Sequence, residues 1–226
     1  MTLKQQLLNK YKYVILLLAL VQHLFVGIML NDMDFYMKIM WPINMIFVGF
    51  ASIGVFIEKG SFKKIIKNFL FLLVFTLPLS LSFVKNSPQI MIVISTVYVL
   101  FFLFIFLEVI RFLIRPNYIN TDIISASICG FLLLIEVCVF LMQVFFYNNS
   151  HSFKGLDMSS TSAVYMDLVY FCSITITSIG FGDITPNTHQ TKLITSLFGI
   201  IGQFYSVVLV GILITKFTSS DDKISH

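Results

Sequence analysis

Charged residues are scarce in this chain. Its 226 residues include 15 Lys and Arg and 11 Asp and Glu, so that charged residues make up 12% of the sequence while 58% of the residues are hydrophobic. A water-soluble domain of this size needs a more polar surface than this composition supplies. The composition therefore excludes an ordinary soluble protein and indicates that lipid surrounds most of the chain. The cationic residues stand in short segments between apolar runs, which does not favour nucleic-acid binding.

Cysteine and histidine are also few, with three Cys and four His in the chain. All three cysteines (Cys129, Cys138 and Cys172) lie in apolar segments, where a thiol usually serves as a small buried hydrophobe. A membrane enzyme would need clustered His, Cys or acidic side chains on facing helices, and the sequence offers only His23 and Glu136, which look isolated from each other. We therefore expect no enzymatic activity and no cofactor.

His23 and Glu136 are nevertheless unusual, because each stands inside an apolar run. For His23 we expect a hydrogen bond between helices rather than a sensing role. For Glu136 we expect a hydrogen bond to a hydroxyl such as that of Ser173 or Thr175, while a proton-sensing role remains open.

Six apolar runs have the length of a transmembrane helix, which needs about 20 residues. They cover about 13–30, 41–57, 66–84, 89–110, 122–147 and 190–215. Another apolar run, at about 163–176, is too short to cross a bilayer. Long runs of this kind are typical of helices and not of the alternating strands of an outer-membrane barrel. Trp41 and Pro42 are expected to be an interfacial aromatic residue and a helix-starting proline.

The distribution of Lys and Arg orients these runs. With the N-terminus in the cytoplasm, the outer connections carry four cationic residues, and the inner ones carry the other eleven: Lys4, Lys10, Lys12, Lys59, Lys63, Lys64, Lys67, Arg111, Arg115, Lys216 and Lys223. This asymmetry follows the positive-inside rule. It predicts a multi-pass protein of the inner or plasma membrane with both termini in the cytoplasm.

The connections divide the chain into three parts. Residues 1–120 are expected to form a four-helix transmembrane domain with a cytoplasmic linker. Residues 121–217 should form a helix–loop–helix unit that contains the short apolar run. Residues 218–226 should be a short cytoplasmic tail, which is too short for a folded regulatory domain.

The short apolar run leads into a segment that contains Gly180 and Gly182. Glycine breaks helices and permits positive φ. Irregular backbone at membrane depth is tolerated only where it is buried in protein or lines a water-filled path. A half-helix followed by such a loop is therefore expected to be a re-entrant pore element. The fold class predicted is an all-α membrane protein with six transmembrane helices, a re-entrant pore helix and a selectivity-filter loop.

A stack of backbone carbonyls can replace the hydration shell of a cation without binding the cation too tightly. Successive carbonyls point to one side when the backbone alternates between right-handed and left-handed conformations. The two glycines permit the left-handed ones. The Ser178 hydroxyl can add the lowest ring of ligands. The C-terminal end of the half-helix, with its negative dipole, would favour a cation at the pore centre.

Residues 178–183 read Ser-Ile-Gly-Phe-Gly-Asp and resemble the filter of potassium channels, commonly Thr-Val-Gly-Tyr-Gly-Asp. The resemblance covers about 121–217. It implies a potassium-selective channel that conducts K+ passively through a homotetramer. By the resemblance the filter comprises Ser178, Ile179, Gly180, Phe181 and Gly182, with K+ bound at the first four.

The resemblance also implies roles for residues around the filter. Thr177, Asp183, Tyr170 and Phe171 would support the filter, with the Tyr170 hydroxyl expected within about 3.2 Å of an Asp183 oxygen. In the last run, Gly202 would be the gating hinge, with helix packing as the alternative. The cavity lining is expected to be Gln203, Ser206, Val210 and Ile214.

The first half of the chain would occupy the place of a voltage sensor, yet Ile90 to Leu107 contains no charge. The whole chain is similar to short bacterial six-span potassium channels, with an architecture like that of voltage-gated channels but without sensor charges. Ser178 and Phe181 depart from the common filter in a combination that resembles ether-à-go-go-type channels. A weakly selective monovalent cation channel and the pore of a potassium uptake system remain alternatives. Expected partners are the lipid bilayer, K+ and an unknown regulatory ligand or protein.

Overall fold

The computed structural model describes residues 3–30, 32–56, 68, 72, 76, 87–114 and 121–221. In the first half, the main helices are α1 (Leu3–Phe25), α3 (Trp41–Ile53) and α5 (Pro88–Ile114). Short helical segments join them, namely η1 (Val26–Met29), α2 (Met33–Phe35), η2 (Tyr36–Met40) and η3 (Gly54–Phe56).

The second half contains two long helices with a shorter helix between them. The long helices are α6 (Thr121–Asn148) and α8 (His189–Asp221), and the shorter one is α7 (Thr161–Ile176). Between α6 and α7 lie η4 (Ser150–Ser152) and β1 (Phe153–Lys154), and β2 (Thr185–Pro186) precedes α8. Helix α8 thus continues past 217, where the sequence predicted the end of the pore domain.

Five helical segments of the described residues are long and apolar enough to cross a membrane: Tyr11–Met29, Tyr36–Ile53, Pro88–Ile114, Asp122–Asn148 and His189–Gly211. Five of the six predicted spans are confirmed in this sense. The remaining one, 66–84, lies outside the described residues except for Asn68, Leu72 and Thr76. Thr161–Ile176 is apolar but too short to cross, as expected.

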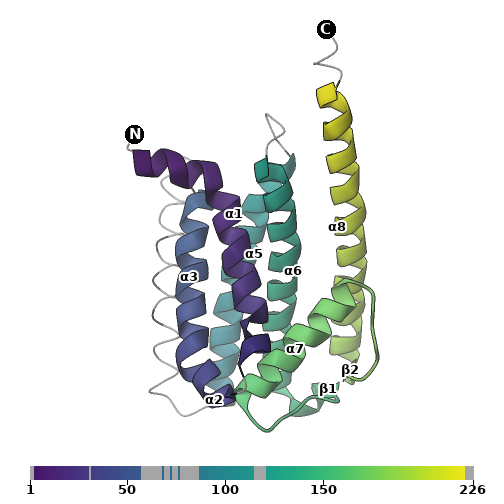
Figure 1. The fold of residues 1–226 in the computed structure, drawn as a ribbon. Coiled ribbons are helices and arrows are strands. Elements are labelled where there is room, and N and C mark those ends of the chain that lie inside the picture. The colour runs from purple at the N-terminus through teal and green to yellow at the C-terminus, as the bar shows by residue number, and fades with distance from the viewer. Residues whose placement is uncertain are drawn as a thin grey trace.

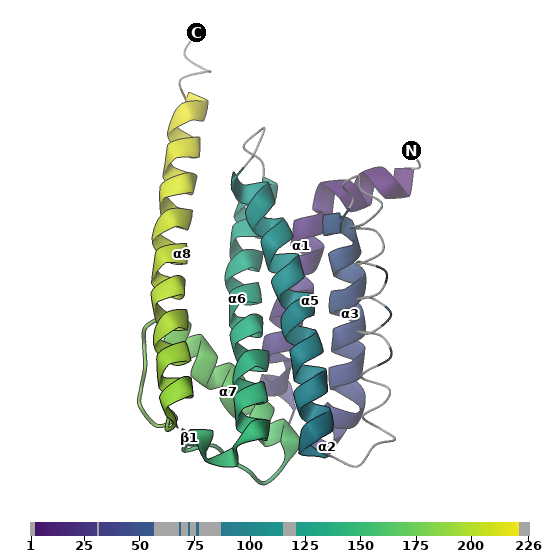
Figure 2. The ribbon, with the colours of Figure 1, turned by 180° about the vertical axis from the view of Figure 1, so that it is seen from behind.

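Helices α1, α3, α5 and α6 run side by side, while α8 stands at the edge of the molecule next to α6 and α7 (Figures 1 and 2). The most extensive contact between helices joins α5 to α6, followed by the contact of α1 with α6. The first half of the chain therefore packs directly on the pore unit of the same chain. The start of α1 and the end of α8 lie at the same end of the molecule.

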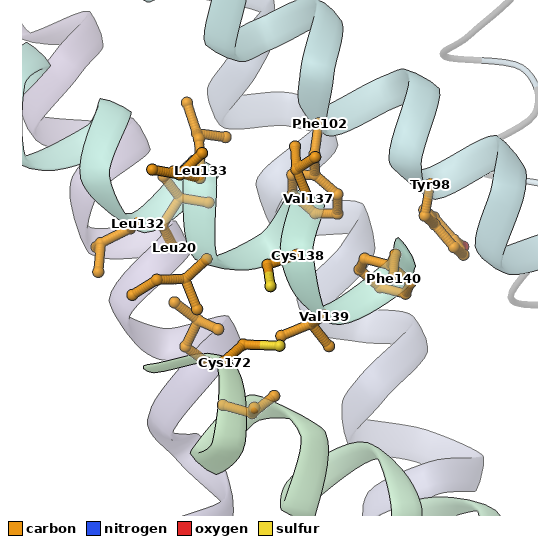
Figure 3. Close-up of a cluster of buried hydrophobic side chains, with 14 of the residues drawn as sticks. Leu20, Tyr98, Phe102, Leu132, Leu133, Val137, Cys138, Val139, Phe140 and Cys172 are labelled. Atoms are coloured by element: carbon orange, nitrogen blue, oxygen red, sulfur yellow. The ribbon is translucent and has the colours of Figure 1, made fainter. Parts of the chain in front are cut away.

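Aromatic and aliphatic side chains fill the space between these helices. Tyr98 and Phe102 of α5 pack on Phe140 of α6 with ring centroids 5.0 and 5.5 Å apart (Figure 3). Cys138 of α6 and Cys172 of α7 lie in the same cluster as free, fully buried thiols. The interpretation of these cysteines as small buried hydrophobes is confirmed.

Trp41, which was expected to be an interfacial aromatic residue, is buried between helices. Its side chain is only 3% exposed, and its indole ring meets the rings of Tyr98 and Tyr165 edge to face at 5.5 and 6.4 Å. The sequence places Trp41 at the start of an apolar run, where an interfacial aromatic is common. Helical backbone already begins at Met33, however, so that Trp41 lies about two turns after the start of this helical stretch.

A small residue sets the distance between α6 and α8. The Tyr205 hydroxyl of α8 crosses to α6 and donates to the carbonyl of Ser127 at 2.7 Å. A Cβ atom added to Gly130 would lie 2.1 Å from that hydroxyl oxygen and 3.0 Å from the ring carbon that carries it. Close approach over small residues is typical of helix packing in membranes.

We expect Gly130→Ala to lower the free energy of unfolding by about 1–3 kcal/mol, because the added methyl group displaces the Tyr205 hydroxyl. The same substitution in a Tyr205→Phe background should cost less, since the oxygen that clashes is gone. Thermal unfolding of the detergent-solubilised protein measures both. Equal losses in the two backgrounds would contradict this account of the α6–α8 contact.

Candidate pore and selectivity-filter site

The pore helix α7 is a half-helix with a defined start and end. It begins after Ser160, whose hydroxyl accepts a hydrogen bond from the Ala163 N–H at 3.1 Å, the usual N-cap arrangement. From there it rises obliquely to about mid-height beside α8, and the chain then returns to the level at which α7 started (Figure 1). This is the course of a re-entrant segment.

The backbone after α7 alternates in handedness. Ser178, Gly180 and Gly182 have φ values of +60°, +55° and +83°, which is every second residue. Glycine adopts such values without strain, whereas serine does not. The sequence predicted positive φ at the two glycines and missed it at Ser178, because no residue type signals it there.

The amide groups at the start of this segment point back to the pore helix. Ile179 N and Gly180 N both donate to the carbonyl of Ile174, at 2.8 and 3.1 Å, and Ser178 N donates to the carbonyl of Thr175 at 3.0 Å. Thr177 donates its hydroxyl to the Ser173 carbonyl at 2.7 Å. These bonds give partners to the carbonyls of Ile174 and Thr175 in the last turn of α7, which would otherwise lack them.

Tyr170 and Asp183 form the predicted hydrogen bond. The Tyr170 hydroxyl donates to Oδ2 of Asp183 at 2.7 Å within one chain. This bond is the main reason that the pKa of the Asp183 carboxyl lies below its usual value. It ties the end of the filter segment to the middle of the pore helix.

The loop after α6 pairs with the segment that follows residues 178–183. Strands β1 and β2 are antiparallel, with Phe153 opposite Pro186 and Lys154 opposite Thr185. Gly155 has a φ of +86°, and a Cβ atom there would lie 2.1 Å from the carbonyl oxygen of Asp183. Neither this close approach nor the strand pair could be predicted from the sequence, because both depend on residues that meet only in the folded chain.

Phe171, predicted as a support residue, is buried and packs edge-on against Phe153 of β1, with ring centroids 5.6 Å apart. It thus packs on the strand that pairs with β2. Its role as a support of the filter stays a prediction.

Gly202 lies against the end of the pore helix. A Cβ atom there would be 2.5 Å from the carbonyl oxygen of Ile176. This contact agrees with helix packing, the alternative to the gating hinge, and the hinge remains a prediction.

The residues predicted to line a cavity differ in their surroundings. Gln203 donates a hydrogen bond from Nε2 to the Ser178 hydroxyl at the base of the filter. Ser206 is half-buried and donates to the Gly202 carbonyl at 3.0 Å, whereas Val210 is exposed. The side chain of Ile214 lies outside the described part of the chain.

A hollow of about 520 Å³ lies between the base of the filter and one face of α8. It is lined by Ser178, Ser196, Gly199, Ile200, Gln203, Phe204 and Val207. Three of the side chains, those of Ile200, Phe204 and Val207, are apolar and exposed in the single chain.

The expectation that His23 and Glu136 are isolated was wrong. Both side chains are fully buried, and His23 Nε2 lies 3.6 Å from Oε1 of Glu136. The expected partners of Glu136 were also wrong, because the Ser173 hydroxyl donates to the Val169 carbonyl instead, at 2.7 Å. The sequence could not show this pair, which is 113 positions apart along the chain. No group of three or more His, Cys, Asp or Glu that could hold a metal ion occurs among the described residues.

Comparison with known proteins supports the pore assignment. Residues 128–219, from α6 to α8, match a family described as "Ion channel". Two-pore potassium channel 5 of Arabidopsis thaliana is 29% identical over 100 residues, which are 44% of this chain and 22% of that protein. Potassium voltage-gated channel subfamily KQT member 3 of Rattus norvegicus is 32% identical over 94 residues, which are 42% of this chain and 11% of that protein.

This part of the chain is therefore an ion-channel pore domain related to those of potassium channels, and the match is to ion channels and not to enzymes. The chain spans less than a quarter of the length of these two curated relatives. No solved structure was found to match it. The family match does not include residues 1–127.

The link between Tyr170 and Asp183 can be tested by titration. Because the hydrogen bond stabilises the carboxylate, Tyr170→Phe should raise the pKa of Asp183 toward its usual value of about 3.9. The stabilisation is present at neutral pH and is lost as the pH falls through the lowered pKa of Asp183. A carboxyl ¹³C NMR titration of the protein in detergent measures the shift. An unchanged pKa would show that the bond does not control Asp183.

Proposed function

We propose that the chain is a subunit of a homotetrameric potassium channel that conducts K+ passively. Each chain contributes one strand of filter, and the K+ sites consist of the carbonyls of Ser178, Ile179, Gly180 and Phe181 with the Ser178 hydroxyl. A dehydrated K+ needs about eight oxygens, which two rings of four carbonyls provide.

The alternating backbone from Ser178 to Gly182 is the observation that carries this proposal. The N–H groups of residues 178–180 donate hydrogen bonds to carbonyls of the pore helix. Their carbonyls are thus left available on the side away from α7, where a cation can replace water. The positive φ at three alternate positions keeps successive carbonyls on that side.

The surface of the single chain supports an assembly around the filter. Residues 177–183 are all exposed, and Ile179 and Phe181 are 56% and 71% exposed. One face of α8 is also apolar and exposed: Leu193, Leu197, Ile200, Phe204, Val207, Val208 and Val210. The irregular polar backbone of residues 177–183 is tolerated at membrane depth only where further protein surrounds it or water reaches it. The apolar face of α8 can pack against the same further protein. Three further copies around the filter axis would provide both.

We further propose that residues 121–217 form the pore domain and 1–120 a supporting transmembrane domain, with both termini in the cytoplasm. The charge asymmetry of the connecting segments supports this orientation. A less selective cation channel is the main alternative, because the Ser178 hydroxyl lacks the methyl group that restricts a threonine side chain.

Potassium flux into liposomes that contain the purified protein tests the proposal. We expect K+ flux with exclusion of Na+, and Gly180→Ala should lower the K+ flux by at least about tenfold, because an L-residue is strained at φ +55° in every subunit. Gly211→Ala is a matched control, since Gly211 has an ordinary helical backbone and no atom within 4 Å of an added Cβ.

Three results would contradict parts of the proposal. Equal flux in the two glycine variants would show that the proposed filter does not lie on the conduction path. Equal entry of Na+ and K+ would favour the less selective channel. A purified particle of one or two chains would exclude the tetramer.

The charges of α5 suggest how the channel responds to voltage. Arg111 pairs with Glu108 of the preceding turn on the same helix, and the described part of α5 carries no further charged side chain. Movement of such a pair transfers almost no net charge across the membrane. In addition, α5 packs along its length on α6, which limits its movement.

We therefore expect a shallow dependence of open probability on potential in planar bilayers. One elementary charge that crosses the field contributes about 2.3 kcal/mol per 100 mV, so steep gating needs several charges per tetramer. A steep sigmoidal conductance curve that disappears when Arg111 and Arg115 are neutralised would contradict this prediction.

A further inference from the structure

A polar cluster is buried where the first half of the chain meets the pore helix. His23 belongs to α1, Glu136 to α6 and Tyr165 to α7, and none of the three side chains is more than 1% exposed. His23 Nε2 lies 3.1 Å from the Tyr165 hydroxyl oxygen and 3.6 Å from Oε1 of Glu136. A single imidazole thus connects three helices from both halves of the chain.

The surroundings of this cluster are aromatic. The His23 ring stacks on Phe102 with centroids 6.3 Å apart and lies 6.5 Å from Trp41. Tyr36 of η2 stacks on Tyr165 at 6.4 Å. The other titratable groups that face the cluster are Tyr98 of α5, Cys138 of α6 and Cys172 of α7.

Glu136 has no conventional partner for a charge. Neither of its oxygens accepts or donates a hydrogen bond within the described part of the chain, and there it makes no ion pair with Lys or Arg. An isolated carboxylate in such surroundings is costly. A proton on either His23 or Glu136 leaves the two side chains together without a net charge.

The position of Tyr165 links the cluster to the filter. Tyr165 lies five residues before Tyr170 on the same helix, about 7.5 Å along its axis. Tyr170 in turn holds Asp183 at the end of the filter. A second contact from the first half lies next to Tyr165, since a Cβ atom on Gly27 would come within 2.2 Å of Met166.

We propose that His23 is a positioning residue for the filter, which fixes the pore helix to the first half of the chain through its hydrogen bond with Tyr165. The first half then acts as a scaffold of the pore helix. The effect on the filter rests on the proposed function, whereas the effect on the pore helix does not.

Hydrogen–deuterium exchange of the purified full chain tests the contact without any need for conduction. His23→Phe and Tyr165→Phe should each speed amide exchange in peptides from α7 by about fivefold, as expected for the loss of one buried hydrogen bond. The double variant should exchange no faster than either single variant, because both substitutions remove the same bond. His23→Gln, which keeps a polar group near the position of Nε2, should restore exchange to within about twofold of the original chain.

Glu136→Gln is the matched control, since it removes the titratable proton but keeps the shape of the side chain and the His23–Tyr165 bond. It should change exchange in α7 by less than about twofold. Tyr165→Phe removes a single oxygen atom and therefore keeps the packing of the core. If His23→Phe fails to fold, Tyr165→Phe and His23→Gln still test the contact.

The second measurement is the ratio of K+ to Na+ permeability in liposomes. His23→Phe and Tyr165→Phe should lower this ratio by at least about threefold, and His23→Gln should restore it. Additive effects in the double variant, no change in α7 exchange, or an equally large effect of Glu136→Gln would overturn the proposal. Faster exchange with an unchanged permeability ratio would also overturn it, because the contact would then be structural only. If the original chain conducts no K+, the proposed function fails, while the exchange data still decide whether His23 fixes the pore helix.

Discussion

The structure depends on one constraint, which is that every backbone polar group at membrane depth needs a partner. The pore helix α7 ends inside the protein, so that its last carbonyls have no helical partners. The amides of residues 178–180 supply them, and this leaves the filter carbonyls available for a cation. The same hydrogen bonds thus end the helix and orient the segment that we propose binds K+.

Much of the remaining structure holds this segment in place. Two contacts hold Asp183 at the end of the proposed filter: the hydrogen bond from the Tyr170 hydroxyl and the close approach of the Asp183 carbonyl to Gly155. The short β1–β2 pair holds the residues that follow. Gly202 allows α8 to approach the end of α7, and Gly130 allows Tyr205 to join α8 to α6. Small residues matter here because helices in lipid gain stability mainly from close contact.

The sequence predicted a voltage-sensor-like domain in the first half, but the described part of α5 carries only Glu108 and Arg111 and no series of sensor charges. The packing of the first half on α6 and α7 of the same chain, and the His23–Tyr165 contact, suit a scaffold better than a moving sensor. Aromatic side chains fill this contact, and the buried pair of His23 and Glu136 lies within them. We propose that the described helices of the first half serve the pore as such a support.

The sequence by itself determined five of the apolar spans and marked the segment that we propose as the filter. Hydrophobic length alone located five helices, because a bilayer sets how many apolar residues a helix needs, and Gly180 and Gly182 marked the segment that must leave helical geometry. The Tyr170–Asp183 bond was also predictable, through the resemblance to known filters. Only the tertiary structure decided which distant residues meet. The burial of Trp41 and the pairing of His23 with Glu136 follow from helix packing, and packing depends on contacts between segments that the order of residues does not reveal. The positive φ of Ser178 belongs to the turn that ends α7, where Ile179 N donates to the Ile174 carbonyl.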